Sequence, residues 1–164
     1  MTYKSVRLSI DPGLNGTGWA LWGDRRLRAV GIITARRNAS SRTSVPFEVR
    51  AHQIACEVVA LTLAHLAQDV IVEYPSYFES SLGQTVARSG DLLKLTTLVG
   101  IISGRVHPLP CVLVPVNTWK GQLPKSIVEK RVKRIIGLEK FNRLRVRSHA
   151  IDAVGIGLWS LGRF

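Results

Sequence analysis

Short apolar runs alternate with longer amphipathic stretches along the chain. Apolar and polar residues alternate in Ser5–Asp11, which predicts a strand, and Thr17–Trp22 and Leu27–Thr34 have the same β-type character. A turn at Gly23–Arg26 separates the second strand from the third. Consecutive strands joined by tight turns predict an antiparallel meander.

Helical periodicity follows a polar, basic loop. Pro46 opens a helix with apolar residues at helical spacing, and Asp91–Val106 has the same pattern. Two short apolar runs, Asp69–Tyr74 and Cys111–Val116, are predicted to be buried strands, each following one helix. Strands that alternate with helices pair in parallel through right-handed crossovers, so these two strands should lie parallel within the same sheet.

The last part of the chain is predicted to be helical. Ser126–Glu129 has the form of a capping box and opens a helix that reaches about Ile136. After a basic stretch, Ser148 is placed to cap a last helix, His149–Leu161. The whole order predicts an α/β fold in one domain, residues 1–164, with a mixed five-stranded sheet and helices on both faces.

The charge balance points to a partner. The chain has 23 Lys and Arg against 11 Asp and Glu, a formal net charge of +12, which predicts binding to a polyanion, most simply nucleic acid. No apolar run is long and uncharged enough to span a membrane. Cys56 and Cys111 form no CxxC pair and lie in apolar surroundings, so we expect buried, reduced thiols. With no signal peptide, we expect a cytoplasmic protein.

Three acids stand where apolar elements begin or end. Asp11 ends the first strand, Glu73 ends the fourth, and Asp152 follows His149 by three residues in the first turn of the last helix. Parallel pairing of the first and fourth strands would bring Asp11 and Glu73 to one sheet end, with the last helix over them. Converging carboxylates need cations between them, and oxygen ligands with an imidazole suit Mg²⁺ or Mn²⁺.

Each of these residues also has an ordinary interpretation. Asp11 fits a turn, Glu73 an ion pair at the sheet edge, Asp152 the positive end of a helix dipole, and His149 a packed imidazole. Their coincidence on a strongly basic chain favours a metal-dependent site for phosphodiester chemistry.

The motifs that hold these residues resemble a known family. Asp11–Gly18 reads D-P-G-x-x-x-T-G, Glu73 ends strand four, and His149–Ala153 reads H-A-I-D-A. Together they resemble the three motifs of RuvC-family Holliday-junction resolvases, of the RNase H-like superfamily, over essentially the whole chain. The compact form is more similar to bacteriophage-encoded members. The resemblance implies an RNase H-like fold and an endonuclease that resolves four-way DNA junctions by paired symmetric nicks.

The resemblance also implies the chemistry of the site. Two metal ions, Mg²⁺ or Mn²⁺, would drive hydrolysis to 5′-phosphate and 3′-hydroxyl ends. Lys120 and Lys125 resemble active-site lysines that hold the scissile phosphate, although a solvated basic loop is the alternative for both. Ser9 stands where the family commonly has Gly. The metal-binding catalytic residues would be Asp11, Glu73, His149 and Asp152.

The resemblance extends to junction DNA. Tyr74, Tyr77 and Phe78 occupy the place of a loop that sets an aromatic ring against the junction bases, but core packing suits each of them equally. A second basic surface is expected from Arg25, Arg26, Arg36, Arg37 and Arg42. The phosphates of the junction arms would be held by Lys130, Lys133, Arg134, Lys140, Arg143, Arg145 and Arg147.

The symmetry of a four-way junction bears on assembly. A C2 homodimer would supply two opposed sites, and we choose Asp91–Val106 as its interface helix. The sequence leaves open whether a branch-migration helicase is a second partner. Two alternatives also stay open: another RNase H-like nuclease acting on RNA–DNA hybrid or branched DNA, and a non-catalytic junction-binding module. A sugar-kinase-like ATPase is disfavoured, because that fold needs two large domains.

Overall fold

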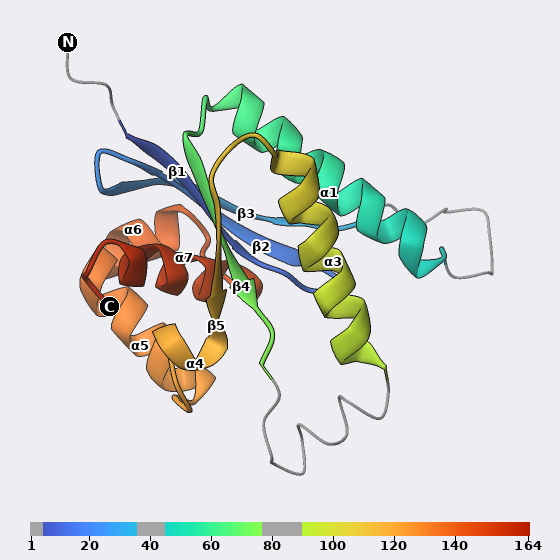
Figure 1. Ribbon diagram of the computed structural model, residues 1–164. Helices are drawn as coiled ribbons and strands as arrows, with labels where there is room; N and C mark the ends of the chain where they lie inside the picture. The colour runs from blue at the N-terminus through green and yellow to red at the C-terminus, as the bar shows by residue number, and fades with distance from the viewer. Residues whose placement is uncertain (1–4, 36–44, 77–89) are drawn as a thin grey trace.

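A mixed sheet with helices on both faces forms the centre of the molecule (Figure 1). The computed structural model describes residues 5–35, 45–76 and 90–164. Strands β1 to β3 pair antiparallel, whereas β1, β4 and β5 pair in parallel, in the order β3-β2-β1-β4-β5. The predicted fold class is therefore confirmed. The strands are β1 (Val6–Asp11), β2 (Thr17–Gly23), β3 (Arg26–Ile33), β4 (Asp69–Tyr74) and β5 (Cys111–Pro115).

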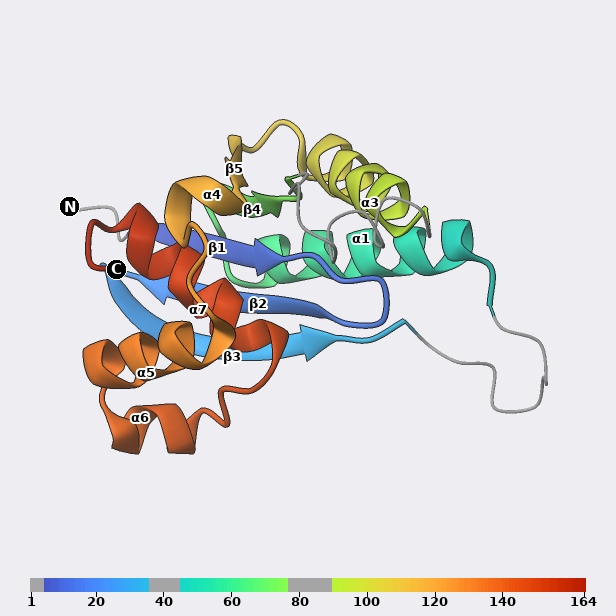
Figure 2. The same cartoon turned by 90° about the horizontal axis from the view of Figure 1, so that it is seen from below.

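The helices divide into two groups, one on each face of the sheet (Figure 2). Helices α1 (Phe47–Ala64) and α3 (Asp91–Val106) pack on each other and cover one face. None of the helices in the described ranges has the length and apolar character that crossing a membrane requires. The other face carries α4 (Val116–Trp119), α5 (Lys125–Ile136), α6 (Leu138–Arg143) and α7 (His149–Ser160).

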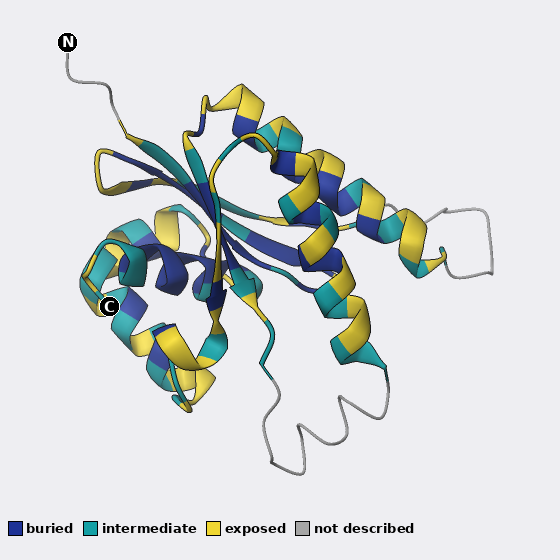
Figure 3. Ribbon diagram, viewed as in Figure 1, coloured by how far each residue is buried: buried dark blue, intermediate teal, exposed yellow. Residues whose placement is uncertain are grey.

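Alternate residues of β1 face opposite sides of the sheet, and each side has its own hydrophobic core. Leu8 and Ile10 are fully buried towards α1 and α3, whereas Ser9 between them faces α7. Figure 3 shows the result as a sheet that is buried through its centre while the outer surfaces of the helices are exposed. A central strand covered on both faces fixes its own register, because a slip of one residue would bury Arg7.

A buried polar link holds α7 against the sheet. The Ser9 hydroxyl donates to the carbonyl of Ala153 at 2.7 Å and accepts a bond from Nε1 of Trp22 at 2.9 Å. The Trp22 ring lies against Gly157, where any Cβ would collide with the indole. Ser9 therefore gives the buried indole N–H of Trp22 an acceptor and links β1 to α7.

The prediction that Cys111–Val116 is a buried strand is wrong in two respects. Strand β5 lies at the edge of the sheet, so Val112 and Leu113 are 51% and 41% exposed. The strand ends at Pro115, and Val116 begins the short helix α4, which the sequence pattern did not reveal. The prediction of buried thiols is also wrong for Cys56, which is exposed on α1.

Both predicted helix caps differ from the structure. Helix α5 begins at Lys125 after Pro124, so Ser126 lies inside the helix and caps nothing, while Glu129 pairs with Lys133 at 2.6 Å. Ser148 does precede α7, but its side chain makes no capping hydrogen bond. Its φ of 45° and ψ of −127° differ from the extended backbone through which a serine cap reaches the first turn.

Candidate active site

The strand register brings two carboxylates to the same end of the sheet, as predicted. Ile10 of β1 pairs with Val72 of β4 in parallel, so the residues that follow them, Asp11 and Glu73, lie side by side at one end of the sheet. The side chain of Asp11 is only 7% exposed and that of Glu73 14% exposed. Two acids at this depth require nearby positive charge or protons.

The start of α7 lies directly over Asp11. Nδ1 of His149 is 2.7 Å from Oδ2 of Asp11. This approach depends on Gly18 in β2, because a Cβ there would meet the carbonyl oxygen of His149 and lie 2.7 Å from the nitrogen of Ala150. Gly13 in the turn after β1 similarly lies beside the imidazole. The glycines of the first motif therefore make room for the third motif.

A lysine bridges the remaining two acids. Nζ of Lys120 lies 3.7 Å from Oε2 of Glu73 and 3.6 Å from Oδ2 of Asp152. The same ammonium group is 4.8 Å from the ring centre of Trp119. Lys120 follows α4 directly, so the short helix sets the position of its side chain. The structure thus brings Asp11, Glu73, His149, Asp152 and Lys120 together.

Trp119 is a site residue that sequence reasoning missed. Its Nε1 donates to Oε2 of Glu73 at 2.8 Å, and its ring packs against Gly155 of α7, where a Cβ would be 2.6 Å away. Its signal in the sequence was a tryptophan directly before the predicted lysine, in a segment read as a loop. Trp119 thus holds the Glu73 carboxylate through its indole N–H and packs α4 against α7.

The burial of these groups changes their proton affinity. Burial raises the pKa of Glu73 to about 7, and the negative charge of Asp11 adds to the rise. Burial also raises the pKa of Asp11, against the hydrogen bond from His149. The hydrogen bond to Asp11 in turn raises the pKa of His149. Burial is thus the main cause for the two acids, whereas for His149 the bond to Asp11 outweighs the opposite effect of burial.

The four predicted metal ligands lie together but do not share a ready-made ion site. Among the described residues, no group of three or more His, Cys, Asp and Glu is arranged to hold a metal ion. Asp11 is engaged with His149, and Lys120 stands between Glu73 and Asp152. The second oxygen of Asp152, Oδ1, is buried and has no hydrogen-bond partner. It is an oxygen donor of the kind that Mg²⁺ and Mn²⁺ prefer.

The other predicted residues lie around this centre with varied exposure. Lys125 begins α5, is exposed, and lies near enough to lower the pKa of His149 against the effect of Asp11. Tyr74 is 37% exposed at the end of β4. Lys133 pairs with Glu129 and lies over the ring of Phe141. Tyr77, Phe78, Arg36, Arg37 and Arg42 lie outside the described residues.

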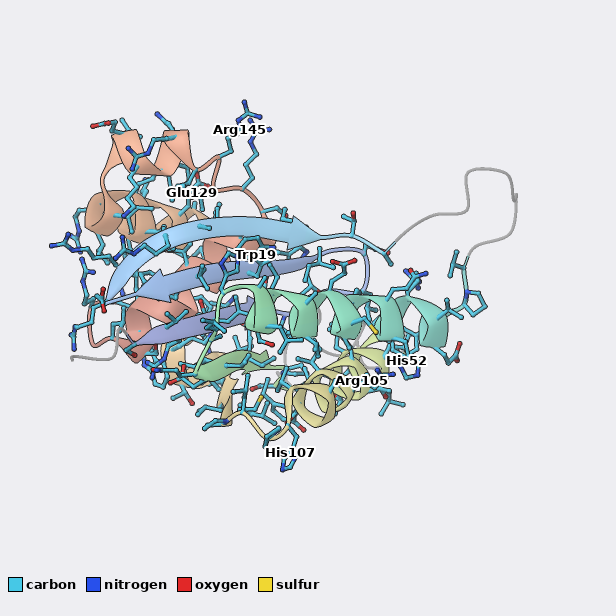
Figure 4. The ribbon with its side chains drawn as sticks, turned by 90° about the horizontal axis from the view of Figure 1, so that it is seen from above. Trp19, His52, Arg105, His107, Glu129 and Arg145 are labelled. Atoms are coloured by element: carbon cyan, nitrogen blue, oxygen red, sulfur yellow. The ribbon has the colours of Figure 1, made fainter. Side chains whose placement is uncertain are left out.

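The remaining predicted phosphate contacts are on the outer surface of α5, α6 and the segment before α7. Arg145 projects away from the body of the protein in that segment (Figure 4). Lys140 is half-buried on α6. The exposed members are Lys130, Arg134, Arg143, Arg145 and Arg147.

The sheet order, the crossovers and the acids at the ends of β1 and β4 define an α/β protein with the RNase H-like fold of the RuvC type. A structure of Thermus thermophilus RuvC in complex with a Holliday junction substrate superposes with a TM-score of 0.68 at 21% identity, over 94% of this chain and 90% of that one. A second Thermus thermophilus RuvC structure gives 0.61 at 20% identity, over 96% and 97% of the two chains. The yeast mitochondrial Holliday junction resolvase Ydc2 gives 0.55 at 13% identity, over 96% and 81%.

No protein-family model and no curated protein matches the chain by sequence. At identities of 13–21% the likeness to these structures is one of fold. Function must therefore be argued from the site itself.

Proposed function

We propose that this protein is a structure-specific endonuclease that resolves four-way DNA junctions by paired, symmetric nicks. The observation that carries the proposal is the convergence of Asp11, Glu73, Asp152, His149 and Lys120 at one sheet end of this fold. The structural neighbours support it, because one is a RuvC in complex with a Holliday junction substrate and another is a Holliday junction resolvase. The surplus of positive charge on the chain fits a DNA substrate.

The chemistry of the donor set suits divalent cations. We propose that Asp11, Glu73, Asp152 and His149 hold two of them, Mg²⁺ or Mn²⁺, in each site, and the unpartnered Oδ1 of Asp152 supports this role. Bound there, the cations supply the positive charge that in-line hydrolysis needs at the attacking water and the departing 3′ oxygen. The expected products carry 5′-phosphate and 3′-hydroxyl ends.

The protein's own residues have separate tasks in this proposal. His149, hydrogen-bonded to Asp11, keeps that carboxylate oriented. Trp119 does the same for Glu73 through its indole N–H. Lys120, at 3.6–3.7 Å from two carboxylates, is placed to turn its ammonium group to a scissile phosphate once cations neutralise those acids. Lys125, exposed at the start of α5, is a second cation for the same phosphate.

Two symmetric cuts require two sites, so we propose a C2 homodimer. Helix α3 is our choice of interface because Leu93 is 73% exposed on it. The arms of the junction would lie along the outward cations of α5 and α6, where Lys130, Arg134 and Arg143 are exposed. Tyr74, which is exposed beside Glu73, would reach unstacked bases.

One assay tests the proposal against its alternatives. Wild-type protein and Asp11→Asn are incubated with Mg²⁺ or Mn²⁺ and a four-way junction, an RNA–DNA hybrid or a flap substrate. We expect paired nicks on the junction alone, with Asp11→Asn still binding the junction but not cutting it. Preferred cleavage of the hybrid or the flap would favour a different nuclease, and junction binding without cleavage by wild type would favour a binding module. Normal cleavage by Asp11→Asn would contradict the proposed site.

A further inference from the structure

Six cationic side chains from three separate parts of the chain gather at the end of α7 that is far from the carboxylates. Figures 1 and 2 both show the turn between β2 and β3, helix α6 and the C-terminus at this same end of the molecule. We name this group the distal cluster. It consists of Arg25, Arg26, Arg28, Lys140, Arg143 and Arg163.

Two hydrogen bonds, and the effect of neighbouring charges on Lys140, show that the members of the distal cluster lie near one another. Nη2 of Arg25 donates to the carbonyl of Leu161 at 2.8 Å, and Nη1 of Arg163 donates to the carbonyl of Arg25 at 3.2 Å. Partial burial lowers the pKa of Lys140, and the charges of Arg143, Arg28, Arg26 and Arg163 lower it further. The C-terminal turn, the β2–β3 hairpin and α6 therefore meet at one surface.

The distal cluster has little compensating negative charge. The acids on the same elements are Asp24, which lies 3.5 Å from Arg28, and Glu139 on α6. Among the described residues, the other five cations have no carboxylate within ion-pair distance. Cations held together without partners repel one another, so a polyanion that binds between them gains more than it would from scattered charges.

The length of α7 sets the distance from the distal cluster to the carboxylates. Helix α7 has 12 residues, which at ~1.5 Å per residue is about 18 Å. Strand β2 joins the same two ends with 7 residues, or about 23 Å at ~3.3 Å each. Because base pairs in B-DNA are ~3.4 Å apart, the separation corresponds to about six base pairs.

We propose that the distal cluster binds the phosphate backbone of a duplex arm of the junction, about six base pairs from the phosphate that is cut. This inference rests on the proposed function, since it takes the carboxylates to mark the cleavage point. A duplex is favoured over an acidic polypeptide because α5 and α6, which lie along the same face, carry further exposed cations such as Lys130 and Arg134. These would extend the contact as a continuous track.

The test compares arm lengths. The protein is titrated in EDTA, which prevents cleavage, with junctions whose arms are about 16 base pairs long or about five base pairs long and closed by hairpin loops. Wild type, Arg26→Gln, Arg143→Gln and the double variant are measured at several salt concentrations. We expect the affinity of the double variant for long arms to fall on the order of tenfold near 0.1 M salt. The slope of log K against log salt should become shallower by about 1.8. Its affinity for short arms should equal that of wild type.

The double variant Arg26→Lys, Arg143→Lys is the matched control, because it keeps both positive charges at the same positions. It should leave both affinities and the salt slope at their wild-type values. Wild type and the glutamine double variant are also titrated with poly-glutamate. Wild-type affinity of the glutamine double variant for long arms, or an equal loss on short arms, would overturn the inference, and loss of poly-glutamate binding alone would assign the cluster to an acidic polypeptide. Failure of the proposed function is recognised separately, because wild type would then not nick the four-way junction in Mg²⁺ or Mn²⁺, whatever its affinity for the junction in EDTA.

Discussion

Nδ1 of His149 lies 2.7 Å from Oδ2 of Asp11, although 138 positions separate the two residues along the chain. The contact joins the end of the central strand to the start of the last helix. It makes the imidazole part of the environment of the most buried acid in the site. An imidazole ligand favours transition metals such as Mn²⁺, whereas a carboxylate ligand suits Mg²⁺. The effect of His149 on the metal preference of the site can therefore be tested.

His149→Asp should shift the preference of the site towards Mg²⁺. The variant replaces a nitrogen ligand by an oxygen ligand on the same helical turn. We expect the ratio of cleavage rates in Mn²⁺ and Mg²⁺ to fall by about tenfold, a change of roughly 1.4 kcal/mol in relative stabilisation. Single-turnover cleavage of a four-way junction in each metal gives the ratio. An unchanged ratio would mean that His149 does not contact the cation.

The crowded acids predict how stability depends on pH. Glu73 has a pKa of about 7 in the folded protein against 4.5 when unperturbed, so folding favours its protonated form. The stabilisation is therefore present below pH 4.5 and is lost as the pH rises to about 7, with an upper bound of ~3 kcal/mol. The pKa values of Asp11 and His149 are raised as well, so they act in the same direction.

Thermal unfolding in EDTA at pH 5.5 and pH 8 measures this effect. We expect a lower Tm at pH 8, by about 5 °C. In Glu73→Gln, which cannot ionise at this position, the difference should shrink. Added Mg²⁺ or Mn²⁺ should raise the Tm more at pH 8 than at pH 5.5, because cations and protons compete for the same oxygens. A Tm of the EDTA-treated wild type that rises between these pH values would contradict the assignment.

Substitution of Lys120 should slow cleavage far more than substitution of Lys125, although both residues resemble active-site lysines. Lys120 is 19% exposed and contacts two carboxylates, whereas Lys125 is exposed at the start of α5. We expect Lys120→Met to slow single-turnover cleavage by about 10²-fold, the usual cost of one preorganised charge at a reacting phosphate. Lys125→Met should cost less than tenfold. The opposite order would assign the phosphate contact to Lys125.

The sequence predicted those parts of the fold and site that depend on local pattern and strand direction. Asp11 and Glu73 could be predicted to lie together because the carboxyl ends of two neighbouring parallel strands lie at the same edge of a sheet. Trp119 was missed because its role depends on the short helix α4, which has no periodicity to detect. The exposure of Val112 was missed because an apolar run has the same composition at the edge of a sheet as at its centre.

Gly18→Ala tests whether the site depends on the close contact between β2 and α7. The new Cβ would collide with the carbonyl oxygen of His149 and lie 2.7 Å from the nitrogen of Ala150. These are backbone atoms, so relief requires α7 to move away from the sheet together with His149 and Asp152. We expect a loss of ~1–3 kcal/mol in unfolding free energy and at least a tenfold loss in junction cleavage at temperatures where the variant is folded.

Glu57→Ala is the control for this prediction. Glu57 is exposed within α1, on the face of the sheet opposite α7. The change should alter the free energy of unfolding by less than about 0.5 kcal/mol and leave cleavage unaltered. Circular dichroism melting and single-turnover cleavage separate the two effects. Cleavage by folded Gly18→Ala at the wild-type rate would show that the reaction tolerates displacement of α7, and that the contact between His149 and Asp11 does not set the geometry of the site.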